Sequence, residues 1–319
     1  MKRTVWFWII GVSLVVLLAC GGFVGLGLWA ANTFGNDSPM GINFGDAVAL
    51  IRVEGVIVPG EAPPPNLFNG DTSGAYSQTI IDQLERANEN DNIKAVVLFV
   101  DSPGGSVFAS DEIYLQINKM EKPIITAMGS MAASGGYYIS APTDEIWASP
   151  HTFTCSIGVI MQMVNFEAFA EEYGITTVVV KSGQFKDIGN PFREVTEADR
   201  AILQSLVDEA YDGFVNIVAE GRGIPVEEVR EIADGRICSG KQAQELHLVD
   251  NLGYLPDVID RAAELGAIDG EPRIIEYSYN GSFFESLAST LYRPGPVEEL
   301  REVLHFNAGS PLMYLYTGQ

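Results

Sequence analysis

The sequence predicts an α/β domain with a largely parallel sheet, preceded by one N-terminal transmembrane helix. Two observations predict this arrangement. Strand-like and helix-like segments alternate along most of the 319 residues, as they do where helices connect parallel strands. Before them, residues 5–31 contain no charged side chain, and about 20 apolar residues are enough to span a membrane as a helix.

The charges around the apolar run predict its orientation. Lys2 and Arg3 precede it, and the first charge after it is Asp37. The positive-inside bias then places the N-terminus in the cytoplasm and the rest of the protein on the extracytoplasmic side of the cell membrane. We expect a cytoplasmic tip (1–4), an anchor (5–31), a linker (32–46), a main domain (47–280) and a C-terminal extension of unknown role (281–319).

Two other interpretations of the N-terminus remain open. The segment 17–20 (LLAC) loosely resembles a lipoprotein signal with Cys20 as the lipidated residue, but the apolar run continues for eleven residues beyond it. A cleaved secretory signal is the second, although its apolar core usually has only about 7–15 residues.

Runs of apolar and β-branched residues predict the strands. The clearest is 94–100 (KAVVLFV), a short continuous run typical of a buried parallel strand. Further strands are expected at 47–58, 123–128, 146–149, 175–181 and 273–279. Residues 59–74 hold four prolines and three glycines and predict an exposed loop.

Apolar residues at helical spacing predict the helices between these strands. The longest begins after Thr196, an N-cap residue followed by acidic residues in the first turn, and runs to about Glu220. The segment 130–140 is expected to start a helix. Other helices are expected at 79–89, 108–120, 166–173, 225–233, 241–248 and 256–265.

Composition excludes some classes of function. The chain has 19 Lys and Arg against 42 Asp and Glu, a net charge of −23, which excludes a general nucleic-acid binder. Its acidic surface indicates no particular substrate. The three cysteines (Cys20, Cys155 and Cys238) cannot build a disulfide framework and lack metal-ligand spacing, so we expect no metal site.

Two glycine-rich segments follow predicted strands. In 101–106 (DSPGGS), a Gly-Gly pair exposes main-chain N–H groups and lets a ligand approach, although a plain β–α turn has the same composition. In 129–138 (GSMAASGGYY), small residues around Ser134 leave room for a substrate carbonyl beside the hydroxyl. A closely packed helix is the alternative for this second segment.

A third segment, 181–191 (KSGQFKDIGNP), places lysines in a loop punctuated by glycine and proline. A lysine amine that loses its hydration holds its proton less tightly and can act as a general base, whereas a solvent-facing lysine does not. A histidine-based triad is not expected, because none of the three histidines lies in a glycine-rich loop. Cys155 is a poor nucleophile candidate because no basic partner is near it in sequence.

Together, in this order, the three segments resemble the signal peptide peptidase A family, in its short form with one membrane span. The resemblance covers about residues 47–280, and the 52 residues between Ser134 and Lys186 also fit this form. It implies the ClpP/crotonase-like fold, a superhelix of repeated β-β-α units with a largely parallel sheet.

The resemblance also implies roles for individual residues. Ser134 matches the nucleophile and Lys186 the general base. Ser156 matches a serine that orients the lysine amine, and the backbone N–H groups of Gly105 and Gly135 match the oxyanion hole.

This sequence departs from the family pattern at two positions. Asp101 stands where related proteases often have Asn, which leaves the main-chain donors unaffected. Asn190 replaces a frequent Ser and can alter hydrogen bonds in the lysine loop, but not the dyad itself. Lys181 is rejected as the base because it adjoins the predicted strand and lacks the Asp-Ile-Gly-x-Pro sequence that follows Lys186.

By resemblance, then, this is a membrane-anchored Ser/Lys endopeptidase without a cofactor. Its expected substrates are remnant signal peptides and other unfolded apolar peptides, and its copies are expected to form a ring with active sites across subunit boundaries. Two rivals remain: an inactive membrane-tethered scaffold of the same fold, and an acyl-CoA enzyme of the crotonase type. The second needs no Ser/Lys pair, and the predicted anchor disfavours it.

Overall fold

The structure is a computed structural model that describes residues 45–63, 74–277 and 313–315. Its elements belong to a compact unit that spans Asp46–Gln319. The predicted anchor and Cys20 lie outside the described residues, as does most of the predicted C-terminal extension. Within the described ranges, no helix is both long and apolar enough to cross a membrane.

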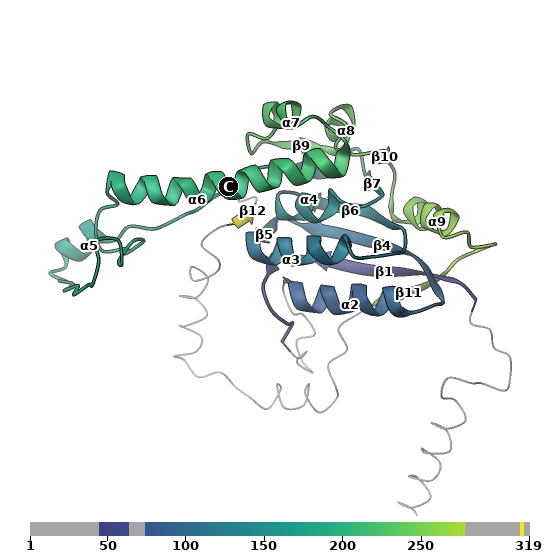
Figure 1. The fold of residues 1–319 in the computed structure, drawn as a ribbon, viewed down its shortest axis with the longest axis horizontal. Coiled ribbons are helices and arrows are strands. Elements are labelled where there is room, and N and C mark those ends of the chain that lie inside the picture. The colour runs from purple at the N-terminus through teal and green to yellow at the C-terminus, as the bar shows by residue number, and fades with distance from the viewer. Residues whose placement is uncertain (1–44, 64–73, 278–312, 316–319) are drawn as a thin grey trace, which may run out of the picture. The chain divides into compact units, whose positions relative to one another are not determined.

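Strands and helices alternate along the described chain (Figure 1). The strands are β1 (Ala47–Glu54), β2 (Ile57–Val58), β3 (Ala75–Tyr76), β4 (Ile93–Ser102), β5 (Gly104–Ser106), β6 (Ile124–Ala132), β7 (Glu145–Ala148), β8 (Phe153–Cys155), β9 (Ile237–Ser239), β10 (Asn251–Leu252), β11 (Arg273–Tyr277) and β12 (Met313–Leu315). The helices are α2 (Ser77–Glu89), α3 (Val107–Ile117), α4 (Gly135–Ser140), α5 (Glu167–Glu172), α6 (Glu197–Arg222), α7 (Val226–Ile232), α8 (Gly240–Glu245) and α9 (Leu255–Leu265).

The main sheet is largely parallel, which confirms the predicted α/β class. Its strands follow the order β10-β7-β6-β4-β1-β11, and each neighbouring pair in this order is parallel. β8 adds in parallel to the end of β6, and β9 pairs with β8 in antiparallel fashion. A second, small sheet has the order β12-β5-β2-β3 and lies beside the ends of β4 and β6.

Both faces of the main sheet are covered, as a parallel sheet requires. Along β1, Ala47, Ala49 and Ile51 point into the larger apolar core, which α2, α3, α4 and α6 also supply. The alternate side chains, Val48 and Leu50, point to the opposite face, where they belong to a second apolar cluster with α9. The alternation follows from the two-residue period of a strand.

Three predictions about elements were wrong in detail. Residues 175–181 do not form a strand, and Val178 and Val180 are 86% and 96% exposed. β-branched residues favour a strand only where a neighbouring strand pairs with them. Segment 130–140 does not begin as a helix, because β6 continues to Ala132. The predicted strand 47–58 is interrupted at Gly55, where φ is 82°.

Candidate active site

Ser134 occupies a strained turn between β6 and α4. Its φ of 53° and ψ of −115° lie outside the regions that a non-glycine residue favours, and such strain concentrates at functional sites. The N–H of Ser134 donates to the Cys155 carbonyl at 2.9 Å, and the residue is only 1% exposed. A strand–turn–helix junction of this kind presents the serine hydroxyl at the edge of a sheet.

The Gly104–Gly105 turn lies directly against the Ser134 turn. Gly104 has φ 94°, and a methyl group on it would come within 2.5 Å of the Gly135 nitrogen. A methyl group on Gly135 would in turn lie 3.1 Å from the Gly105 nitrogen. Two glycine main chains therefore meet beside the serine. Main-chain N–H groups brought together in this way can stabilise an oxyanion.

Ser102 fastens the two turns to each other, a role that the sequence analysis missed. Its hydroxyl donates to the Gly55 carbonyl at 2.6 Å and accepts from the Gly104 N–H at 3.0 Å. Its carbonyl accepts from the Ala133 N–H at 3.0 Å. The position of Ser102, directly before the Pro-Gly-Gly turn, was the available signal for this role.

Asp101 holds the end of β6. One of its carboxylate oxygens accepts from the Ser130 hydroxyl at 2.8 Å and from the Met131 N–H at 3.0 Å. An asparagine side-chain oxygen could accept the same two hydrogen bonds. The hydrogen bonds that support the end of β6 are therefore the same whether position 101 is Asp, as here, or Asn.

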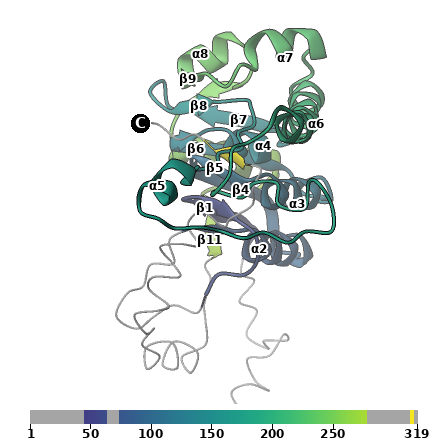
Figure 2. The same ribbon diagram turned by 90° about the vertical axis from the view of Figure 1, so that its left-hand side faces the viewer.

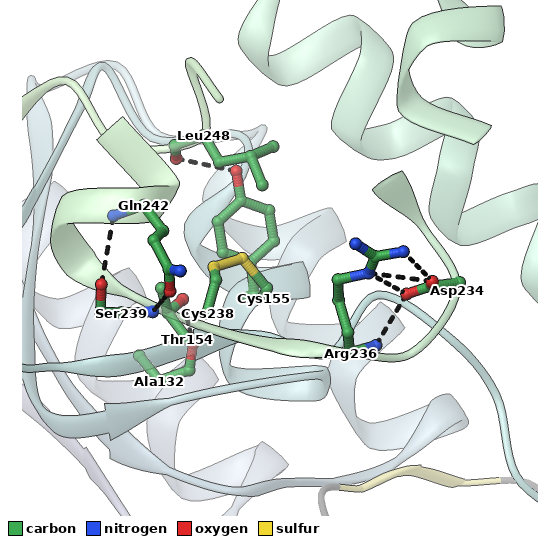
Figure 3. The surroundings of a disulfide bond; sticks show 10 residues. Ala132, Thr154, Cys155, Asp234, Arg236, Cys238, Ser239, Gln242 and Leu248 are labelled. Carbon is green, nitrogen blue, oxygen red and sulfur yellow. Dashed lines mark hydrogen bonds and ion pairs between the residues drawn. A yellow bond between two sulfur atoms is a disulfide. The ribbon is translucent and has the colours of Figure 1, made fainter. Parts of the chain in front are cut away.

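Ser156 lies in a turn that touches the serine turn through Cys155. Cys155 and Ser156 have φ of 66° and 53°, so two consecutive residues are left-handed. Cys155 forms a disulfide with Cys238 of β9, 83 residues away in sequence (Figure 3). No sequence pattern pairs these two cysteines, because their approach depends on the contact between β8 and β9.

Lys186 is not brought to Ser134 within this single chain. It is exposed, in a loop between α5 and α6, and its main-chain N–H donates to the Gly183 carbonyl. The chain from α5 to α6 runs as a long loop outside the main sheet (Figure 2). Of the predicted site residues, the structure thus places Gly105, Ser134, Gly135 and Ser156 together and leaves Lys186 on this loop.

Arg193 ties the lysine loop to the N-terminal end of α6. Its guanidinium donates to the Asp187 carboxylate at 3.2 Å and to Asp199 at 2.5 and 3.2 Å. Hydrogen bonding to Arg193 holds the pKa of Asp199 well below its usual range. Lys181, rejected as the base, binds the Asp187 carboxylate at 2.7 Å, and this contact lowers the pKa of Asp187.

Helix α4, which follows the Ser134 turn, contacts the middle of α6 through aromatic rings. Tyr138, four residues after Ser134, lies 5.1 Å from Phe214 between ring centroids. Burial raises the pKa of Tyr138 well above its usual range, so its hydroxyl stays protonated and donates to Asp111 at 2.9 Å. Asp199 precedes Phe214 by fifteen residues, which is about 22 Å of helix. Within one chain, the contact of the lysine loop with α6 and the contact of Tyr138 with α6 therefore lie about four helical turns apart.

The C-terminal strand β12 occupies the edge of β5, a feature that the sequence analysis missed. Tyr314 lies opposite Gly105 in the antiparallel pair. Its ring lies 4.7 Å from both Tyr138 and Phe214, and its hydroxyl donates to the Ala210 carbonyl at 2.9 Å. β12 is thus itself an extended segment that covers the strand edge beside Gly105, opposite the edge that pairs with β2.

No group of three or more His, Cys, Asp or Glu side chains gathers at a metal-binding distance in the described ranges. The local chemistry at the site consists of serine hydroxyls and main-chain donors.

Comparisons with known proteins identify the family. Residues 116–269 match the model of peptidase family S49. A protein from Enterococcus faecium named signal peptide peptidase SppA is 40% identical over 242 residues, which cover 75% of this chain and 69% of that protein. The chain belongs to peptidase family S49. It is a serine peptidase of the SppA type, as the three motifs predicted.

Other relatives of this S49 peptidase differ in length. A protease of Methanocaldococcus jannaschii is 36% identical over 204 residues, which cover 63% of this chain and 64% of that protein. Protease 4 of Haemophilus influenzae is 34% identical over 232 residues, 70% of this chain but only 35% of that protein. The chain thus spans about two thirds of the first relative and about a third of the second.

Proposed function

We propose that this S49 peptidase is a membrane-anchored endopeptidase in which Ser134 is the nucleophile and Lys186 the general base. The observation that carries the proposal is the strained Ser134 turn, packed against the main chains of Gly105 and Gly135. Membership of the S49 family favours a peptidase over an acyl-CoA enzyme.

In the proposed reaction, the neutral Lys186 amine takes the proton of Ser134 while the serine oxygen attacks a peptide carbonyl carbon. The oxyanion receives hydrogen bonds from the N–H groups of Gly105 and Gly135, and one such donor contributes about 3–4 kcal/mol in comparable sites. The lysine ammonium then protonates the leaving amine as the peptide bond breaks. Water, deprotonated by the same amine, releases the acyl group from Ser134.

The lysine in this proposal comes from a neighbouring copy of the chain. Within one chain, Arg193 ties the Lys186 loop to the beginning of α6, whereas Tyr138, four residues after Ser134, contacts α6 at Phe214. This separation along α6 supports a site shared between copies. The segment around Lys186 also exposes large apolar side chains that a neighbour would cover. These side chains are Phe169, Tyr173, Ile175, Val178, Val179 and Val180.

The proposed location is the extracytoplasmic side of the cell membrane, with residues 5–31 as the anchor. The Cys155–Cys238 disulfide supports this location, because disulfides persist mainly in oxidising compartments. The proposed substrates there are remnant signal peptides and other unfolded apolar peptides.

Hydrolysis of a short apolar fluorogenic peptide by the full chain in detergent tests the proposal. We expect Ser134→Ala and Lys186→Ala to lose hydrolysis by about 10³-fold or more while keeping the parent's circular dichroism and assembled mass. Hydrolysis by folded Ser134→Ala at the parent's rate would contradict it. Absence of hydrolysis in a correctly assembled parent would favour the scaffold alternative.

A further inference from the structure

We propose that the Cys155–Cys238 disulfide positions the active site by fixing the turn that carries Ser156 and supports Ser134. The roles assigned to these two serines come from the proposed function, and the inference adds how they are held. Neither cysteine belongs to the motifs that suggested the family.

The disulfide joins two strands that are too short to hold each other firmly. β8 and β9 have three residues each and form one antiparallel pair. β8 pairs with β6 only at Phe153, opposite Met131, and β9 has β8 as its single partner strand in the described ranges. Pairs this short contribute little stability of their own. Cys155 and Cys238 are 3% and 6% exposed, so the bond lies inside the apolar core (Figure 3). It covalently links segments that are 83 residues apart.

The linked turn contacts the nucleophile directly. The Cys155 carbonyl accepts the Ser134 N–H at 2.9 Å, so a displacement of Cys155 displaces a hydrogen-bond partner of the strained serine. Because Cys155 and Ser156 are both left-handed, their conformation persists only if the surroundings enforce it. The disulfide acts at the first of these two residues.

Hydrogen bonds hold the other side of the turn less securely. The Ser156 N–H donates to the Arg236 carbonyl at 2.8 Å, and the Gly235 N–H donates to the Ile157 carbonyl at 3.0 Å. The Arg236 side chain itself pairs with Asp234, but this ion pair is exposed and contributes little. The disulfide is therefore the strongest connection between the turn and β9.

The test uses the full chain in detergent and compares the parent with Cys155→Ala and Cys238→Ala. Maleimide labelling after denaturation shows whether the disulfide is present: we expect one of the three cysteines to react before reduction and all three after it. Val258→Ala is the matched control, because Val258 is 1% exposed in the apolar cluster on the opposite face of the main sheet.

Two readouts separate positioning from general stability. Below the unfolding temperature of every variant, kcat for the fluorogenic peptide should fall about tenfold or more in both cysteine variants, with KM within about twofold of the parent's. Hydrogen exchange at the Ser134 amide should accelerate in the same two variants. Val258→Ala should lower the unfolding temperature but leave kcat and Ser134 exchange at the parent's values.

Any one of three results would overturn the proposal. All three cysteines could react with maleimide before reduction, or the Ser134 amide could exchange at the parent's rate in folded Cys238→Ala. The third is that Val258→Ala changes kcat and Ser134 exchange as much as the cysteine variants do. The proposed function fails separately, if the parent shows no hydrolysis that depends on Ser134. In that case, faster Ser134 exchange confined to the cysteine variants would still support the positioning role of the disulfide.

Discussion

Close contact between glycine main chains determines which residues can stand beside Ser134. A methyl group on Gly135 would lie 2.7 Å from the buried Ser110 hydroxyl and 3.1 Å from the Gly105 nitrogen. A methyl group on Gly105 would collide with the Ile57 carbonyl of β2. The main chains can approach this closely only because neither residue carries a side chain.

Gly135→Ala should therefore lower kcat by about 100-fold or more, because the added methyl group displaces one of the proposed oxyanion donors. Steady-state hydrolysis of the fluorogenic peptide measures this effect. Gly213→Ala is the matched control: Gly213 lies in α6 with open space at its Cα. It should keep parental activity and gain about 0.5–1 kcal/mol of stability. Equal activity of the two variants would contradict the role of Gly135.

The network of ion pairs around Arg193 is the main electrostatic feature at the scale of elements. It connects Asp187, which is adjacent to the proposed base Lys186, with Asp199 in the first turn of α6. Asp199 is also part of a capping box with Thr196, whose hydroxyl accepts the Asp199 N–H at 3.1 Å. The lysine loop is thus fixed to the beginning of the longest helix.

This network predicts how stability depends on pH. The pKa of Asp199 is lowered in the folded protein by Arg193, whereas an unfolded aspartate titrates near about 3.9. The stabilisation is therefore fully present above about pH 4 and is lost as the pH falls through the lowered pKa. Asp199→Asn should lower the urea midpoint at pH 7 and weaken its decline as the pH falls below about 4.

Urea unfolding at several pH values, followed by circular dichroism, measures this effect. Asp208→Asn, at an exposed position of the same helix, is the control and should retain the parent's pH dependence. If Asp199→Asn and the parent lost stability equally in acid, the network would not contribute to folding.

Sequence patterns predicted elements that depend on local signals. The cap at Thr196 and the apolar run of β4 are examples, and both were found. Features that depend on contacts between distant segments were not predicted. The 155–238 disulfide needs the pairing of β8 with β9, and β12 needs a free edge on β5. The strand expected at 175–181 failed for the same reason, because its composition favours pairing but does not supply a partner.

The candidate site follows the same rule: its local turns were predictable from sequence, and its contacts between distant segments were not. Ser134, Gly105 and Gly135 stand in motifs whose glycines indicate tight turns, and the structure brings these turns together. The support from Ser102 and Cys155 was missed, because the Ser102 hydroxyl and the Cys155 carbonyl bond to main-chain groups that the fold, and not the local sequence, brings to them.

At the scale of the whole molecule, the proposed dyad needs more than one copy of the chain. Ser134 approaches the middle of α6 through Tyr138, whereas the lysine loop is tied to its beginning by Arg193. Residues 175–180 present apolar side chains to solvent in a single copy. In the proposed assembly the copies form a closed ring. Such a ring would place active sites between neighbouring copies and would cover the apolar side chains of residues 175–180.

A shared site predicts complementation between two inactive variants. Ser134→Ala and Lys186→Ala, coexpressed in equal amounts, should assemble with sites that combine an intact serine of one copy with an intact lysine of another. Random assembly should restore about a quarter of the parent's peptide hydrolysis, since half of the copies supply each group. With a different affinity tag on each variant, sequential purification through both tags must recover mixed assemblies, and mass photometry must show that they have the parental size. No recovered activity in such assemblies would mean that both groups come from the same chain.

The central claim, that Ser134 is the nucleophile activated by Lys186, is tested most directly by covalent labelling. The full chain in detergent is treated with a serine-directed fluorophosphonate, and the modified residue is located by peptide mass mapping. The account predicts an adduct on Ser134 in the parent, none in Ser134→Ala, and labelling of Lys186→Ala slowed by about 100-fold or more. A chain that hydrolyses peptide while its adduct lies on another serine, or while Lys186→Ala is labelled at the parent's rate, would contradict it.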